Sequence, residues 1–319
     1  MPSNSTTVIG AGISGLACAR ALTEAGVPVR VLDRGNRAGG RMASRTLHGR
    51  QVDLGASYLT ASSGSPFAAV VEDWVARGLA RPWTDTFAVA GPDGVRETRT
   101  GPMRYGAPGG LRELVIDLAR GVSLTQQRTV AAVEAGPLVD GEPCAAAVLA
   151  LPDPQARRLL TRGSPADGAL DARGWQPTLS VALGWGVRQW PADLHGAFVH
   201  DSPVLDWIAD DGDRRGDGAP VLVAHTTPAF SEEHLGDPAA ATDAVVAAVQ
   251  RCLGIAAAPG WSHVHRWTFA KPVSPREEPF HLADGIGLCG DGWSAPSKVQ
   301  SAWTSGHLLG LELARTLAG

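Results

Sequence analysis

The start of the chain alternates between short apolar runs and a longer segment with apolar side chains at helical spacing. Residues 7–9 are β-branched and stop at a glycine, and apolar positions then recur every few residues up to Gly26. A second apolar run covers residues 27–32. This pattern predicts a strand, a tight turn, a helix and a second strand, which is the βαβ unit of nucleotide-binding sheets.

The end of the chain repeats the same order. Residues 285–292 form an apolar run that ends in Gly-Asp-Gly, and residues 299–317 follow a long amphipathic pattern. We therefore expect a second strand, turn and helix there.

The middle of the chain predicts a second domain. Strands are expected at residues 179–185 and 220–225, with a helix behind them at residues 237–253. Aromatic side chains among charged, glycine and proline residues set residues 62–100 apart as well. We expect a discontinuous FAD-binding domain and a substrate domain, the first of residues 1–61, 101–152 and 271–319, the second of residues 62–100 and 153–270.

Length and charge restrict the partners. At 319 residues the chain is about twice the usual domain size. Its net charge is −4, with 28 basic and 32 acidic residues mixed along the sequence, so no basic stripe is available for nucleic acid. The N-terminus lacks the basic region of a signal peptide, and the longest apolar run, residues 144–151, is too short to cross a membrane. We expect neither nucleic acid nor a membrane as a partner.

Cysteines and acidic residues give no sign of a metal site. The four cysteines lie far apart with no CxxC pair, which fits reduced thiols and a cytoplasmic location. Residues 210–218 are rich in aspartate, but they lack the glutamate and the spacing of a calcium loop. A solvated hairpin is expected at these residues, and no metal.

Three glycines at the first turn predict a dinucleotide site. Gly10 allows the turn, Gly12 lets the backbone approach a pyrophosphate, and Gly15 lets the helix pack on the strand. The helix N-terminus offers its N–H groups to the phosphates. Asp33 stands 18 residues beyond Gly15 and can accept from both ribose hydroxyls, which favours FAD or NAD over NADP. The alternative is that the glycines serve helix packing alone.

Two further segments favour a flavin over a nicotinamide. Gly39 and Gly40 let the chain pass close to a cofactor, and Arg41 can donate paired hydrogen bonds to phosphates or ring oxygens. At the other end, Asp291 can accept from ribityl hydroxyls. The helix after it would direct its N-terminus at the flavin N1 and C2 carbonyl, where negative charge collects on reduction.

Longer motifs extend across the chain. They include GAGISGLACARAL (10–22), GGRM (39–42), VDLGASYLT (52–60), ALPDPQ (150–155), HRW (265–267) and GDGWSAPSKVQSAWTSG (290–306). On these residues the chain resembles the FAD-dependent amine oxidase superfamily, and within it the small bacterial renalase-like proteins. The resemblance implies an α/β (overall α+β) protein with a Rossmann-type FAD-binding domain of the p-hydroxybenzoate-hydroxylase-like kind and a mixed-sheet substrate domain.

The resemblance also implies positions for the cofactor. In it the backbone of Val130 would approach the adenine. Together with the motifs above, it gives as cofactor-binding candidates Gly10, Gly12, Ile13, Ser14, Gly15, Asp33, Arg34, Gly40, Arg41, Met42, Ala56, Val130, Gly290, Asp291 and Val299. Departures from the renalase pattern concern the substrate face more than the cofactor: Ser57, Leu59, Gly110, Phe230 and Gln300.

Aromatic and polar residues suggest a substrate pocket. The chain has ten tryptophans and two tyrosines, and aromatic rings suit a flat or cationic substrate. The resemblance places four tryptophans near the flavin: Trp185, Trp207, Trp267 and Trp293. Tyr58 and His225 are candidate pocket donors, Arg266 a candidate for binding a substrate phosphate, and Lys298 a candidate for approaching the flavin. For each, a role in the core or in a surface ion pair is the alternative.

The resulting hypothesis is an FAD-dependent oxidase. A small, reduced, nitrogen-containing substrate would give hydride to flavin N5, and O2 would be reduced to H2O2. By resemblance, the substrate could be the 1,2- or 1,6-dihydro isomer of NAD(P)H. One alternative is an amine oxidase, or a desaturase of a biosynthetic intermediate. Another, of a different class, is a non-catalytic redox sensor that holds FAD or NAD.

Overall fold

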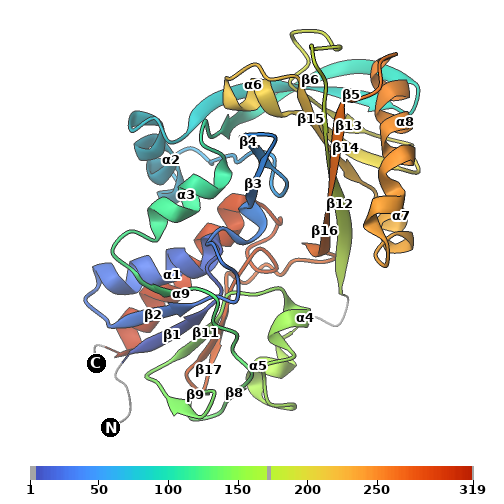
Figure 1. Ribbon diagram of the computed structural model, residues 1–319. Helices are drawn as coiled ribbons and strands as arrows, with labels where there is room; N and C mark the ends of the chain where they lie inside the picture. Colours follow the sequence, from blue (N-terminus) through green and yellow to red (C-terminus); the bar gives the residue numbers. More distant parts are fainter. Residues whose placement is uncertain (1–4, 171–173, 318–319) are drawn as a thin grey trace.

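Two sheets organise the molecule. The computed structural model describes residues 5–170 and 174–317 (Figure 1). Figure 1 shows a mainly parallel sheet flanked by α1 and α9, and beside it a larger mixed sheet with α7 and α8 on its outer side. This is the α/β architecture predicted from the sequence.

The six-stranded sheet has the order β17-β18-β11-β1-β2-β7. Five of its strands are parallel, and β17 runs antiparallel to β18. The strands are β1 (Thr6–Ile9), β2 (Val29–Leu32), β7 (Ser123–Thr125), β11 (Ala147–Leu149), β17 (His281–Ala283) and β18 (Ile286–Leu288). The strands predicted at both ends of the chain therefore lie in one sheet, with β11 between them.

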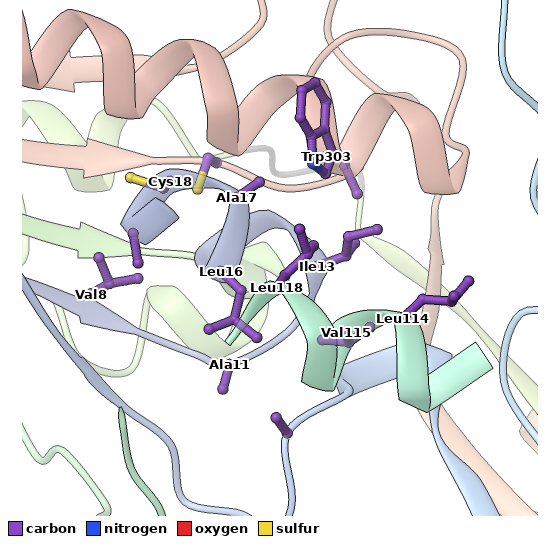
Figure 2. Packing of buried hydrophobic residues seen from close by; sticks show 14 of the residues in the cluster. Val8, Ala11, Ile13, Leu16, Ala17, Cys18, Leu114, Val115, Leu118 and Trp303 are labelled. Carbon is purple, nitrogen blue, oxygen red and sulfur yellow. The ribbon is translucent and has the colours of Figure 1, made fainter. Parts of the chain in front are cut away.

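Helices from both ends of the chain pack together on one face of this sheet. α1 (Ile13–Glu24) and α9 (Val299–Leu317) approach so closely that a Cβ on Gly306 would lie 1.9 Å from the carbonyl oxygen of Ser14. Figure 2 shows Leu16 and Trp303 in the shared apolar core, beside α3 (Leu111–Leu118). α2 (Pro66–Ala76) joins this core through Phe67, Val71 and Trp74.

Short elements cover the other face. α4 (Asp153–Ala156) and α5 (Pro165–Gly168) bury Ala156, Leu160, Ala166 and Leu170 against the sheet. A small sheet of β8 (Val133–Glu134), β9 (Leu138–Val139) and β10 (Glu142–Pro143) lies in the same region. The hairpin of β3 (Ser44–Leu47) and β4 (Arg50–Asp53), preceded by the 3-10 turn η1 (Gly40–Met42), leads toward the second sheet.

The second sheet is mixed and has the order β16-β12-β15-β14-β13-β5-β6. Only the β13 and β5 neighbours are parallel among its pairs. The strands are β5 (Arg81–Gly91), β6 (Gly94–Gly106), β12 (Trp175–Gly184), β13 (Gly196–Val199), β14 (Leu205–Asp210), β15 (Val221–Thr226) and β16 (Trp261–Pro272). The predicted strands at residues 179–185 and 220–225 are β12 and β15.

The two faces of the mixed sheet differ in what covers them. On the outer face, Val181, Leu222 and Ala224 pack with Val245 and Val249 of α8 (Thr242–Leu253). α7 (Pro228–Glu233) and η2 (Pro238–Ala241) precede that helix. On the inner face, Ala182, Val221 and Val223 pack with Val52 and Leu54 at the β4 hairpin. The inner face is therefore the one turned toward the cofactor half.

Two segments lie with a different sheet than their composition suggested. β6 continues to Gly106, so the chain leaves the mixed sheet later than the expected boundary at residue 101. Residues 153–170 pack on the parallel sheet rather than with the substrate half. Composition does not reveal which of two sheets a segment joins. The division into two domains stays a prediction.

A short helix lies within residues 210–218, where a solvated hairpin was expected. α6 (Asp211–Arg215) is capped by Asp210 Oδ1, which accepts from the N–H of Asp213 at 2.9 Å. Both of its arginines and Asp211 are buried. The charges can be buried because they pair with one another within α6 and also with Asp53 and Arg50 of β4, and a local pattern does not show the partners on β4. No group of three or more metal-ligating side chains occurs in the part of the chain that the structure describes.

A membrane-spanning helix is also missing from the described residues, since none of their helices is both long and apolar enough to cross a bilayer.

Candidate cofactor and substrate site

The first turn has the geometry that a dinucleotide site needs. Gly10 adopts φ +107°, and a Cβ there would lie 2.7 Å from the carbonyl oxygen of Ala150. A Cβ on Gly15 would lie 2.0 Å from Gly10 O, so only glycine lets α1 approach β1. Gly12 is the N-cap of α1 and faces Gly40, whose Cβ would lie 3.1 Å from Gly12 Cα. The two glycine motifs thus meet backbone to backbone, and Ile13 and Ser14 begin the buried helix behind them.

Asp33 lies at the end of β2, next to this turn. Its Oδ2 accepts from the N–H of Ala11 and its Oδ1 from that of Gly35, both at 2.6 Å. The carboxylate is half-buried and has further lone pairs for a ribose hydroxyl. Arg128 N–H donates to Asp33 O at 2.9 Å, which brings the segment leading to buried Val130 alongside. The neighbouring Arg34 is exposed.

Arg41 and Asp291 bind each other. Both Nη atoms of Arg41 donate to the carboxylate of Asp291, with Nη1 at 2.8 Å from Oδ2. Nη1 also donates to Ala270 O at 3.0 Å, and the guanidinium lies over the Trp175 ring at 4.9 Å. Ser297 Oγ donates to Asp291 Oδ2 at 2.7 Å. The sequence predicted a separate cofactor contact for Arg41 and for Asp291. In the structure these two residues, 250 positions apart, bind each other.

The remaining cofactor candidates surround this pair. Met42 is buried in η1, and the N–H of Ala56 donates to Arg41 O at 2.8 Å. Gly290 adopts φ +144° and donates its N–H to Ser305 Oγ of α9 at 3.0 Å. Val299 is the first residue of α9. Residues 10–15, 40–42 and 290–299 therefore converge, and glycine leaves the backbone bare where a pyrophosphate would approach, so the residues present fit FAD.

Several substrate candidates share the inner face of the mixed sheet. Ser180 pairs in register with both His265 and His225, and His225 pairs with Trp207. Residues directly opposite on neighbouring strands point to the same side. Trp267, two residues beyond His265, therefore points that way too, and its Nε1 donates to Leu54 O at 2.6 Å.

Tyr58 joins this face from the loop after β4. Its ring centroid lies 5.2 Å from that of Phe87 and 5.8 Å from that of Trp207, within an aromatic cluster that also contains Trp83. Burial raises the pKa of Tyr58, although the charge of Arg104 opposes the shift. The phenol is therefore protonated near neutral pH and can donate a hydrogen bond.

The histidines on this face are uncharged near neutral pH. Burial, then the charges of Arg214 and Lys271, lower the pKa of His225 to about 4. Burial, then the charge of Arg45, lowers the pKa of His265 to about 4 and also lowers that of His263. The Nε2 atoms of His225 and His263 are buried without a hydrogen-bond partner among the residues that the structure describes. Each can bind a neutral polar group of a ligand.

Arg266 lies on the opposite face. It pairs in register with Leu179, and its Nη1 donates to Leu235 O at 2.5 Å. The structure thus separates it from Tyr58, His225 and Trp267, against its predicted role in binding a substrate phosphate. The reason is the two-residue period of a strand: in HRW, His265 and Trp267 share one face and the residue between them takes the other.

The remaining substrate-site candidates, Lys298, Trp185 and Trp293, lie in different parts of the structure. Lys298 is exposed just before α9. Trp185 packs with Trp190 on the α8 side, and its Nε1 donates to Ala257 O at 2.9 Å. Trp293 packs in the core below the parallel sheet, under the Arg276 guanidinium at 4.0 Å. Trp185 and Trp293 are core residues, and Trp207 is equally buried in the aromatic cluster around Tyr58, whereas Trp267 is half-buried on the inner face.

Sequence reasoning missed four groups near the inner face: Arg45, His263, His265 and Lys271. The strand alternation around Trp267 could have revealed the histidines. Nothing local indicates Arg45, which reaches the site only because β3 folds beside β16.

Comparison with known families identifies the group to which these features belong. The profile of the NAD(P)-binding Rossmann-like domain matches residues 8–74, and that of the flavin containing amine oxidoreductases matches residues 85–308. The chain belongs to the flavin-containing amine oxidoreductase family. Members of this family are FAD-dependent oxidoreductases, and the cofactor of this chain is FAD.

Curated relatives match over short stretches. A probable polyamine oxidase 4 of Arabidopsis thaliana is 47% identical over 68 residues, 21% of this chain and 14% of the relative. A putrescine oxidase of Kocuria rosea is 34% identical over 96 residues, 30% of this chain and 20% of the relative. These matches cover a fifth or less of each relative's length, so they do not transfer its activity.

Solved structures match over the whole chain. A candidate protoporphyrinogen oxidase of Exiguobacterium sp. 255-15 has a TM-score of 0.77 at 16% identity, covering 99% of this chain and 100% of the other. Putrescine oxidase bound to putrescine has a TM-score of 0.70 at 13% identity, covering 99% of both. At such identities the likeness shows the fold alone.

Proposed function

We propose that this family member is a renalase-like oxidase whose substrate is a misreduced dihydronicotinamide, the 1,2- or 1,6-dihydro isomer of NAD(P)H. FAD, when bound, accepts the hydride and passes the electrons to O2, which gives H2O2. The observation that carries the proposal is the charge of the inner face, where neutral imidazoles lie among positively charged side chains.

Positive charge suits an anionic substrate. Burial lowers the pKa of His225, and the charges of Arg214 and Lys271 add to the shift; Arg45 adds in the same way to the effect of burial on His263 and His265. Because Arg214 is paired with Asp211, the positive charge available to a substrate is that of Lys271 and Arg45. A dinucleotide carries phosphates that such charges attract, whereas a polyamine would be repelled.

The nearby carboxylate of Asp213 has other partners. Asp213 Oδ2 accepts from Trp83 Nε1 and contacts His195 Nδ1, each at 2.6 Å. It is therefore not a free anion of the kind that a diamine needs.

The weak bases of the site fit the same substrate. A dihydropyridine that loses hydride becomes a cation without releasing a proton, so no strong base is needed. An amine must first lose its proton to present a lone pair. His225 and His265, with pKa values lowered to about 4, are poor proton acceptors but can orient a neutral group. The half-buried Trp267 offers a ring against which a flat nicotinamide can lie.

The test is anaerobic absorbance spectroscopy of the FAD-loaded protein. Addition of 1,2- or 1,6-dihydro-NAD(P) should bleach the flavin bands, and air should restore them with one H2O2 per substrate. Absence of bleaching with every isomer would contradict the proposal.

Amine oxidation is the second candidate, because the curated relatives include polyamine and putrescine oxidases. Bleaching by putrescine or spermidine alone would assign the protein to that class. A protein that is stably yellow and never bleached by either class, nor by candidate desaturase substrates, would fit a redox sensor.

A further inference from the structure

A cluster of buried charges lies where α6 meets β4. Arg214 and Asp211 are fully buried, and the side chains of Asp53 and Arg215 are almost so. Arg214 forms an ion pair with Asp211, and Arg215 contacts Asp53 Oδ1 and Asp211 Oδ2 at 3.1 Å each. Burial raises the pKa of Asp211, but the neighbouring guanidinium groups, Arg214 first, lower it to about 2. The four groups thus form one network of ion pairs.

Of the two arginines, Arg214 is the one that contacts the loop after β4, which carries Ser57 and Tyr58. Nη1 of Arg214 donates to Ser57 O at 2.7 Å, and its Nη2 lies 3.4 Å from Asp53 O. The side chain of Ser57 is held as well, because its Oγ accepts from Trp207 Nε1 at 2.9 Å. Tyr58 is the next residue. Hydrogen bonds therefore hold both the carbonyl and the side chain of the residue that precedes Tyr58.

We propose that Arg214 is a positioning residue that sets the place of Tyr58 on the inner face by holding the carbonyl of Ser57. The effect on turnover rests on the proposed function, in which Tyr58 contacts the substrate. The hydrogen bond from Arg214 to Ser57 O does not depend on that function. A buried guanidinium is costly unless its charge is paired, as that of Arg214 is with Asp211. A short hydrogen bond from such a fixed group defines the carbonyl position closely.

Arg215 provides a matched control. It sits beside Arg214 on α6, is nearly as buried and shares Asp53 and Asp211. Its remaining donor goes to Pro108 O at 3.3 Å and not to the Ser57 loop. Loss of either arginine disturbs the same acids, but only loss of Arg214 releases Ser57.

The experiment compares Arg214→Lys, Arg214→Met and Arg215→Met in the FAD-loaded protein. The indole N–H resonance of Trp207, assigned with Trp207→Phe, reports the Ser57 loop without any turnover. It should shift in Arg214→Met, shift less in Arg214→Lys and stay in place in Arg215→Met. With the substrate that bleaches the flavin, kcat should fall by about tenfold to a hundredfold in Arg214→Met, with partial recovery in Arg214→Lys.

Equal effects of Arg214→Met and Arg215→Met on the resonance and on kcat would overturn the proposal, because both arginines would then be merely structural. If Arg214→Met does not fold, the same comparison is made with Arg214→Lys and Arg215→Lys. A wild-type protein that no substrate bleaches would contradict the proposed function, while the Trp207 resonance would still decide whether Arg214 holds the loop.

Discussion

The ion pair of Arg41 and Asp291 links the two cofactor segments through single side chains. Two parallel hydrogen bonds between a guanidinium and a carboxylate fix both groups in one plane. Asp291 is mostly buried, and Arg41 is its ion-pair partner. The pair therefore presents α9 and η1 to the cofactor as one rigid unit.

Arg41→Lys should weaken FAD binding by about tenfold, because an ammonium cannot make the paired contact and leaves Asp291 partly unsatisfied. Titration of the apoprotein with FAD, followed by absorbance, gives the change in Kd. Arg20→Lys is the control, since Arg20 forms an exposed pair with Glu24 on the outside of α1. Similar Kd values for all three proteins would show that the pair does not contribute to cofactor binding.

His225 should make the free energy of unfolding depend on pH. Its pKa lies at about 4 in the folded protein against an ordinary 6.5, so the unfolded chain takes up the proton first and the folded state loses stability as pH falls from about 6.5 to 4. His225→Gln should reduce the loss of unfolding free energy between pH 7 and pH 5 by about 1–2 kcal/mol. Urea denaturation at the two pH values measures it, with exposed His200→Gln as control. An unchanged loss would show that His225 titrates normally.

At the scale of elements, close helix packing should be the most sensitive feature. A Cβ at position 306 would meet the backbone of Ser14, and one at Gly310 would meet Cys18 O at 2.6 Å. Gly306→Ala should destabilise the protein by roughly 1–3 kcal/mol because backbone cannot yield as a side chain can. Thermal denaturation should show a Tm several degrees lower, with Gly236→Ala, where a Cβ meets nothing within 4 Å, unchanged. Equal Tm values would mean that α9 shifts freely.

Elements formed by interactions between residues close in sequence could be predicted, and elements that depend on residues far apart in sequence could not. The βαβ unit and α9 were predicted because glycines, β-branched runs and helical spacing are local signals. α6 was not, because its charged residues are buried by pairing with one another and also with Asp53 and Arg50 of β4, which are far away in sequence. Local composition favoured solvent exposure for Asp211 and its neighbours, and only the fold brings the β4 partners to them.

At the scale of the whole molecule, the site depends on which sheet face meets the cofactor half. Tyr58, His225 and Trp267 were candidates from motif and strand position, and the structure brings them to one face. Arg266 was assigned without regard to strand alternation. Arg45 and Lys271 were missed because they come from β3 and from the edge strand β16, and their approach depends on how the two sheets face each other.

The same arrangement yields a test of the substrate's charge. Charge reversal by Arg45→Glu or Lys271→Glu should raise KM for a dihydronicotinamide dinucleotide about tenfold at low salt, with a smaller effect at high salt where charges are screened. Arg266→Glu, on the opposite face of β16, should leave KM unchanged. If the natural substrate is a polyamine, the first two variants should instead lower its KM, because they remove a repulsion. The sign of the change in KM therefore separates the two substrate classes, independently of how fast either is oxidised.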